Sequence, residues 1–255
     1  MHLARSPLVL VLVQVRFPKR IGMETEVGAF RGECEALGYP LTYEGTVQTI
    51  GVGIPGIPVT SMPRWDFLDR NRHWNIVLTQ EFLLLQTSEY GRFGEFLDRW
   101  KLVLDAARRT LGVRLIERLG LRYVDLVQPT PSEKVADYVD AALAGYEPDA
   151  ESGFHRERHV AATVLRTDKG QMLVRVSPAT SPFPPDMDSV HLVGLKTPLE
   201  GAVFLDFDHA STQVLDFDPS CIVAATAGLH DAHDLLFEKI ATPHAKTAWG
   251  WEEAP

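Results

Sequence analysis

The residues best suited to chemistry lie toward the C-terminal end of the chain. Leu205 to His209 reads Leu-Asp-Phe-Asp-His, and the period-two alternation of a strand would place Asp206 and Asp208 on the face opposite Leu205 and Phe207. Two carboxylates on one face can hold a divalent cation or share a proton. They are also what the solvent face of a half-buried strand carries, and we expect this second interpretation to hold.

A second group lies on a helix expected over residues 220–240. His230 and His233 are three residues apart, so both imidazoles share one face of a helix and can point at one metal ion. The spacing assigns no third ligand, and Leu229 and Leu236 beside them predict instead that His233 packs at the edge of the core. The metal hypothesis therefore draws on both groups, namely Asp206, Asp208, His209, His230 and His233.

The most unusual polar set is the sequence Arg-Leu-Gly-Leu-Arg-Tyr at residues 118–123. Arg118 and Arg122 are four residues apart, and therefore on one face of a strand, with a glycine between them that leaves room for a close approach. Together with Tyr123 they can clamp an anion or contact a partner. The alternative is a pair of cross-strand bridges to acids such as Asp206 and Asp208, and we expect these ion pairs.

Motifs for cofactors and for common catalytic mechanisms are absent from the sequence. Residues 51–56 have the spacing Gly-x-Gly-x-x-Gly, but Pro55, Pro58 and Pro63 prevent the helix that a dinucleotide site needs at the third glycine. We find no P-loop, nucleophile elbow, Ser-x-x-Lys, His-Glu-x-x-His or Cys-His motif. The sequence therefore predicts no bound cofactor and leaves any catalytic residue unassigned.

Composition and charge restrict the partners. The chain has 25 Lys and Arg against 34 Asp and Glu, so its formal net charge of -9 argues against binding to nucleic acid or anionic lipid. Its clearest apolar run, 8–13, is too short for a signal peptide, and no run approaches the about 20 residues of a membrane span. Cys34 and Cys221 have no metal-binding spacing and are expected to be buried thiols. We therefore expect a cytoplasmic location.

Hydrophobic periodicity predicts an α+β fold. Period-two runs predict a strand ending at Pro18, a strand over 41–52, a meander from Arg64 to Leu84, and strands over 118–127, 159–165, 172–176 and 203–209. Spacing by three and four predicts helices over 21–37, 91–111 and 220–240. Because the strands come in consecutive groups, the sheet should be mainly antiparallel and covered on one side by long amphipathic helices.

The same pattern bears on domain organisation. We expect residues 1–255 to form a single compact α+β domain. Three strands and a long helix are predicted in each half of the chain, so two similar halves derived from a duplication are a further hypothesis, with a join near residues 147–155. No repeat of individual residues accompanies it.

Several of these blocks occur together in one family. Arg-Phe-Pro at 16–18, Trp-Asp-Phe at 65–67, Arg-Leu-Gly-Leu-Arg-Tyr at 118–123 and Leu-Asp-Phe-Asp at 205–208 resemble a sporadically distributed family of uncharacterised bacterial proteins of about this length. That family usually has Asn where this chain has Asp125, which weakens a role for a neutral amide there. The resemblance implies a bacterial protein but no activity. A patchy distribution suggests an accessory, defence or toxin-antitoxin locus.

Two functions from different classes follow from these observations. The first is a non-enzymatic binding or scaffold protein for a partner polypeptide. It is motivated by five tryptophans, of which Trp249 and Trp251 lie in a terminal segment expected to be solvated. The alternative is a metal-dependent or small-molecule enzyme that uses the aspartates and histidines named above. A homo-oligomer is compatible with either function.

Overall fold

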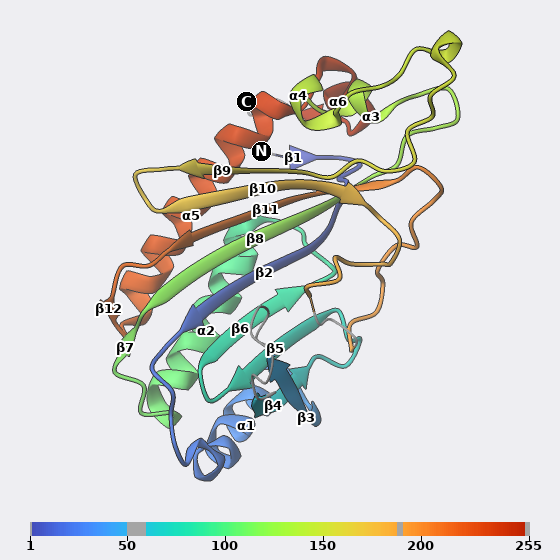
Figure 1. The fold of residues 1–255 in the computed structure, drawn as a ribbon. Helices are drawn as coiled ribbons and strands as arrows, with labels where there is room; N and C mark the ends of the chain where they lie inside the picture. Colours follow the sequence, from blue (N-terminus) through green and yellow to red (C-terminus); the bar gives the residue numbers. More distant parts are fainter. Residues whose placement is uncertain (1, 50–59, 188–190, 253–255) are drawn as a thin grey trace.

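The largest element of the fold is a nine-stranded sheet (Figure 1). The computed structural model describes residues 2–49, 60–187 and 191–252. Across the sheet the strands are β3 (Leu41–Thr49), β4 (Thr60–Leu68), β5 (Trp74–Thr79), β6 (Phe82–Thr87), β2 (Leu8–Arg16), β8 (Arg118–Val127), β11 (Val203–Ser211), β10 (Gln171–Pro178) and β9 (Ala161–Arg166). All neighbouring strands are antiparallel. The predicted α+β class with an antiparallel sheet is therefore confirmed.

Tight turns and one long-range pairing set the order of the strands. The turn after β4 begins at Asp69, whose carboxylate accepts hydrogen bonds from the backbone N–H groups of Asn71 and Trp74. The turn between β9 and β10 is closed by the N–H of Thr167, which donates to the carbonyl of Gly170 at 2.9 Å. β2 and β8 come from distant parts of the chain, and their pairing joins the two groups of strands.

One of the prolines near the glycine-rich stretch lies within a strand. β4 begins at Thr60, so Met62 and Pro63 belong to a strand. Pro63 is tolerated there because a strand can include proline at positions where its missing N–H is not needed. The Gly-x-Gly-x-x-Gly stretch at 51–56 lies outside the described residues.

Six helices accompany the sheet in the part of the chain that the structure describes. They are α1 (Val27–Ala36), α2 (Phe93–Thr110), α3 (Val135–Tyr138), α4 (Ala141–Ala144), α5 (Pro219–Ile240) and α6 (Pro243–Ala248). α1 starts later than predicted because Gly22 has a positive φ of 81° and a 3-10 turn follows it. α5 starts at Pro219, where the Asp218 carboxylate caps it by accepting from the N–H of Cys221. None of the helices described here has the combination of length and apolarity that crossing a membrane requires.

A large core lies between the sheet and the three longest helices. Phe30 of α1, Trp100 of α2 and Ile222 of α5 are buried there against strand side chains such as Phe67 and Leu121. Alternate residues of β2 and β8 enter this core because successive side chains of a strand point to opposite faces. In Figure 1, α2 and α5 run behind the sheet.

The opposite face of the sheet carries a smaller core. Leu10, Val124 and Phe204 point to this face from β2, β8 and β11. Met187 and Leu192, from the long connection between β10 and β11, pack against them. Both faces of the central strands are therefore covered, which explains why nearly all of β8 is buried.

The two terminal segments pair with each other. β1 (His2–Leu3) and β13 (Trp251–Glu252) form a small antiparallel sheet in which Leu3 lies opposite Trp251. Trp249 is 6% exposed and stacks on Phe237 of α5, with ring centroids 5.6 Å apart. Trp251 stacks on the same phenylalanine. The expectation that this segment is solvated is therefore wrong for Trp249, which is buried, and Trp251 is partly buried.

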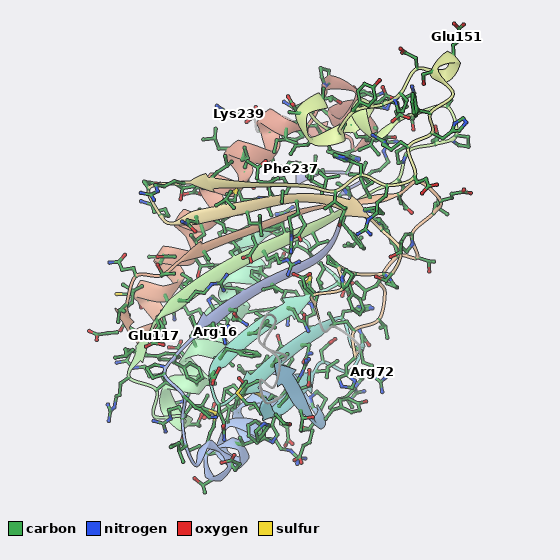
Figure 2. All side chains as sticks on the ribbon, viewed as in Figure 1. Arg16, Arg72, Glu117, Glu151, Phe237 and Lys239 are labelled. Carbon is green, nitrogen blue, oxygen red and sulfur yellow. The ribbon has the colours of Figure 1, made fainter. Side chains whose placement is uncertain are left out.

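The two cysteines and the segment between α4 and β9 can be compared with the expectations from the sequence. Cys34 is buried as predicted, whereas Cys221 is exposed because it faces outward on the first turn of α5. The segment between α4 and β9, where a join was expected, projects away from the sheet, with Glu151 at its tip (Figure 2). Tyr146 and Phe154 on this segment are 79% and 72% exposed. The segment therefore lies apart from the cores.

Trp249→Ala should lower the free energy of unfolding by about 3–5 kcal/mol, because it leaves a cavity beside Phe237 and Tyr138. Leu235→Ala is the matched control: Leu235 is 59% exposed on α5, and its loss should change stability by less than about 0.5 kcal/mol. Chemical denaturation followed by far-UV circular dichroism measures both. Equal effects would show that Trp249 is not part of the packed structure.

Candidate functional site

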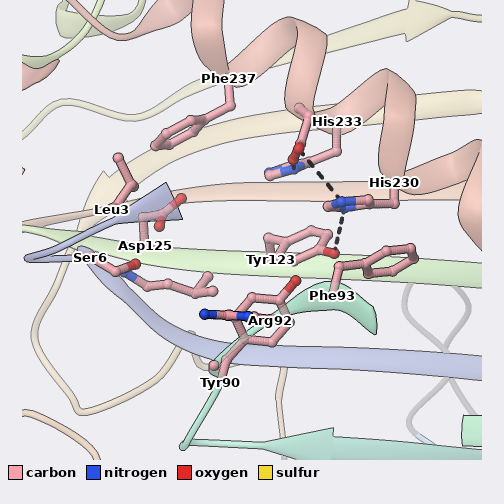
Figure 3. A pocket seen from close by; sticks show the side chains of 13 residues that line it. Leu3, Ser6, Tyr90, Arg92, Phe93, Tyr123, Asp125, His230, His233 and Phe237 are labelled. Atoms are coloured by element: carbon pink, nitrogen blue, oxygen red, sulfur yellow. Dashed lines mark hydrogen bonds and ion pairs between the residues drawn. The ribbon is translucent and has the colours of Figure 1, made fainter. Parts of the chain in front are cut away.

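A cavity of about 630 Å³ lies between α2, α5 and the centre of the sheet (Figure 3). Its polar wall residues are Ser6, Tyr90, Arg92, Tyr123, Asp125, His230, His233 and Asp234. Its apolar wall includes Leu3, Leu8, Phe93 and Phe237. Strand alternation brings Tyr123 and Asp125 of β8 to this face, and helical spacing by three and four brings His230, His233 and Asp234 of α5 to it.

Three potential metal ligands are grouped on α5. One ligand atom from each of His230, His233 and Asp234 can be chosen so that all three lie within 4.8 Å of one another. His230 Nε2 is 3.5 Å from Asp234 Oδ2, and His233 Nδ1 is 3.4 Å from Asp234 Oδ1. Both imidazoles therefore face one carboxylate.

His230 is held in place from two sides. Its Nδ1 lies 2.9 Å from the hydroxyl oxygen of Tyr123, and its ring stacks on Phe93 with centroids 3.6 Å apart. Burial lowers the pKa of His230 to about 4, so the imidazole is neutral at neutral pH. Burial likewise raises the pKa of Tyr123 well above its ordinary value, which keeps its hydroxyl protonated. A neutral imidazole is the form that binds a metal ion.

His233 is more deeply buried, at 5% exposure. Its ring stacks on Tyr123 and meets Phe207 edge-on, so the expectation that it packs at the edge of the core is confirmed. Its Nε2 atom is buried with no hydrogen-bond partner among the described residues. Burial lowers its pKa, and the hydrogen bond to Asp234 opposes that shift.

Asp125 forms another part of the wall. Its side chain is 3% exposed, and its Oδ2 atom has no hydrogen-bond partner among the described residues. Burial, followed by the negative charge of Asp206, raises the pKa of Asp125 to about 8. The cavity therefore contains a protonated carboxyl group at neutral pH as well as the ionised Asp234, whose pKa is lowered.

The five residues of the alternative metal hypothesis are not brought together. Asp206 and Asp208 lie on the face of β11 opposite Leu205 and Phe207, as the alternation predicted, and this face points away from α5. His209 lies on the α5 side, but its Nδ1 contacts the carbonyl of Leu229 at 3.0 Å and its Nε2 contacts Thr167 Oγ1 at 2.9 Å. Of the five residues, only His230 and His233 reach the cavity, because adjacent residues of a strand point to opposite faces.

The arginines expected to form ion pairs do so on that other face. Arg122 donates twice to Asp206 at 2.8 Å and once to Asp186 at 2.9 Å. Arg118 lies 3.3 Å from Asp208. A smaller cavity of about 240 Å³ is lined by both arginines.

Arg175 completes this network by contacting the two acids that Arg122 also contacts. The three arginines of the network, Arg118, Arg122 and Arg175, are matched by three acids, Asp186, Asp206 and Asp208. The positive charge is therefore balanced, which argues for a structural role rather than an anion clamp.

Several wall residues were not assigned to a site from the sequence. Asp234 follows His233 directly and is four residues from His230, so the helical spacing did contain the missing third ligand. Tyr90, Arg92 and Phe93 come from the start of α2, and no sequence pattern links them to α5. Their position depends on the packing of α2 against α5.

Comparison with known proteins adds no assignment: no protein-family model matches this sequence, and no curated protein matches it significantly. Function is therefore argued from the geometry of the cavity.

Asp206→Asn should lower the free energy of unfolding by about 3–5 kcal/mol, because it removes the buried charge that Arg122 and Arg175 share. Asp208→Asn is the matched control on the same strand face. Its pair with Arg118 is longer, with both side chains 29% exposed, so the cost should be below about 1 kcal/mol. Urea denaturation compares them, and an equal loss in both variants would contradict the structural role of Asp206.

Asp125 should make the protein less stable as pH rises. Between the ordinary pKa of 3.8 and the raised pKa of about 8, the unfolded chain has lost this proton while the folded chain retains it. The free energy of unfolding should then fall by up to about 1.4 kcal/mol per pH unit relative to Asp125→Asn. Denaturation of both proteins across this range tests the sign, and a constant difference would show that Asp125 is ionised in the fold.

Proposed function

We propose that the protein binds a transition-metal ion of the zinc class through His230, His233 and Asp234, and acts on a small molecule held in the adjoining cavity. The observation that carries this proposal is the convergence of three ligand atoms within 4.8 Å on the wall of a cavity of about 630 Å³. Two histidines and a carboxylate are a ligand set that zinc uses in catalytic sites.

The distances within the cluster are compatible with a bound metal ion. The two imidazole–carboxylate separations, 3.4 and 3.5 Å, are longer than the about 2.7–3.2 Å of good N–H···O hydrogen bonds. Two atoms bound about 2.0–2.1 Å from a tetrahedral ion are separated by about 3.3 Å. The two imidazole–carboxylate separations therefore match those of ligand atoms around one ion, and all separations within the cluster are at most 4.8 Å.

The surroundings of His230 support the same proposal. A metal-binding histidine usually donates its second ring N–H to an oxygen that fixes its orientation. The Tyr123 hydroxyl is in position to accept from Nδ1 of His230, which leaves Nε2 toward Asp234. Stacking on Phe93 further restricts the ring.

Three protein ligands are typical of catalytic zinc sites, where a fourth position is open to water or substrate. An ion in such a position polarises a carbonyl group or lowers the pKa of bound water. The protonated Asp125 on the same cavity wall supplies an acid. We therefore propose a metal-assisted reaction of the hydrolytic type, which is the enzyme alternative considered from the sequence with a revised set of ligands.

The non-enzymatic function, binding of a partner polypeptide, has lost its main support. Trp65, Trp74, Trp100 and Trp249 are all buried, so they do not form a surface for a partner. Exposed apolar side chains such as Leu102 of α2 and Leu235 of α5 lie on separate elements, and Tyr146 and Phe154 lie on the projecting segment between α4 and β9. Scattered exposure of this kind is ordinary for a folded protein.

We also propose that the helices cover one face of the sheet and that the chain consists of two similar halves. In strand order, β2 and β8 are neighbours, with β6, β5, β4 and β3 on one side and β11, β10 and β9 on the other. Each group is followed in sequence by a long helix, α2 or α5. This division favours a join between α2 and β8 over one near residues 147–155. It would place the cavity at the contact between the halves.

Protein loaded with zinc after chelator treatment should bind about one equivalent, as measured by elemental analysis after gel filtration. Asp234→Asn should weaken zinc binding about 100-fold or more because it removes a charged ligand. Tyr123→Phe should weaken it about 10- to 100-fold, because His230 loses the group that orients it.

His244→Ala is the control for this series. His244 is an exposed histidine of α6 that pairs with Glu133, so its loss should leave zinc binding unchanged. Less than about a tenth of an equivalent of zinc in the wild-type protein would overturn the metal proposal. An equal loss in the His244 and Asp234 variants would do the same, because it would show binding at scattered surface groups.

A further inference from the structure

Asp125 differs from the acids on the opposite face of the sheet in the hydrogen-bond partners of its carboxyl group. Asp206 accepts hydrogen bonds from two arginines, whereas Oδ2 of Asp125 has no partner among the described residues. Both side chains are nearly inaccessible, at 2% and 3% exposure. A buried carboxylate without a cation is unfavourable, so such a group takes up a proton or awaits a ligand.

The surroundings of Asp125 are mainly apolar on its own side of the cavity. Figure 3 shows its carboxyl group near Leu3 and Ser6, below Phe237. The charge of Asp206 on β11 adds to the effect of burial on its pKa, and Lys196 in the connection between β10 and β11 opposes it. The other charged or titratable wall groups are Tyr90, Arg92, Tyr123, His230, His233 and Asp234.

We propose that Asp125 is the recognition group of this cavity, and that it donates a hydrogen bond to an uncharged carbonyl oxygen of a ligand with an aromatic or branched aliphatic body. The inference deepens the proposed function by naming the substrate class, an uncharged amide or ester, and rests on that function only for the metal ion. Aromatic wall residues such as Tyr90, Phe93 and Phe237 suit such a body.

Charged ligands fit the cavity less well. A cation would require Asp125 to lose its proton in a site where burial opposes ionisation. An anion would meet the carboxyl group of Asp234 on the cavity wall. Arg92, the cation on the wall, is exposed to solvent, and its attraction for an anion is therefore screened.

Three probes of nearly the same shape separate these cases: benzamide is uncharged, benzamidine is a cation and benzoate is an anion. Their dissociation constants for the metal-free full chain are measured by NMR titration at about pH 6.5, below the pKa of Asp125. Benzamide should bind about tenfold more tightly than either charged probe.

Substitutions of Asp125 assign the effect to this residue. Asp125→Asn keeps a hydrogen-bond donor and should bind benzamide within about threefold of the wild type. Asp125→Leu removes the donor while keeping the branching at Cγ, and should weaken benzamide binding about tenfold. Asp208→Leu, on the opposite face of the sheet, is the control and should have no effect.

Benzamidine binding as tightly as benzamide would overturn the proposal, as would unchanged benzamide binding in Asp125→Leu or no detectable benzamide binding. If the Asp125→Leu variant does not fold, the comparison of the three probes on the wild-type protein still tests the proposal. Zinc binding is measured separately, and Asp125→Asn should bind zinc as the wild type does. Absence of zinc binding together with an intact preference for benzamide would overturn only the metal proposal. Normal zinc binding together with loss of the benzamide preference would overturn only the proposal that Asp125 recognises a carbonyl group.

Discussion

The pairing of β2 with β8 is the constraint on which the rest of the structure depends. These strands meet in the middle of the sheet, and both of their faces are covered. Successive residues of β8 must therefore suit different surroundings: Tyr123 and Asp125 face α5, whereas Arg122 and Val124 face the connection between β10 and β11. A shift of one residue in register would exchange the two sets and bury Arg122 against the helices.

The polar groups on these two faces are satisfied to different degrees. On one face, Arg118, Arg122 and Arg175 are matched in number by acids, and such a network contributes mainly to specifying the strand pairing. On the other face, Asp125 and His233 each keep a buried atom without a partner among the described residues. Unsatisfied buried groups are costly, and their occurrence together on one cavity wall is why function is sought there.

Much of the fold follows from local sequence pattern, whereas the site follows only in part. Alternation sufficed to place Asp206 and Asp208 on one face of β11, and helical spacing sufficed to place His230 and His233 together. Alternation also separates His209 from Asp208, which rules out a ligand set drawn from consecutive strand residues. The contribution of Tyr90 and Arg92 depends on how α2 packs against α5, and the burial of Trp249 depends on pairing between the two ends of the described chain. Such long-range contacts leave no periodic signal in the sequence.

The pairing of β1 with β13 has a consequence for biosynthesis. Leu3, which lines the cavity, is synthesised about 250 residues before its partner Trp251. The wall of the cavity is therefore incomplete until β13 has been synthesised. Whatever occupies the cavity can be enclosed only after β13 has paired with β1.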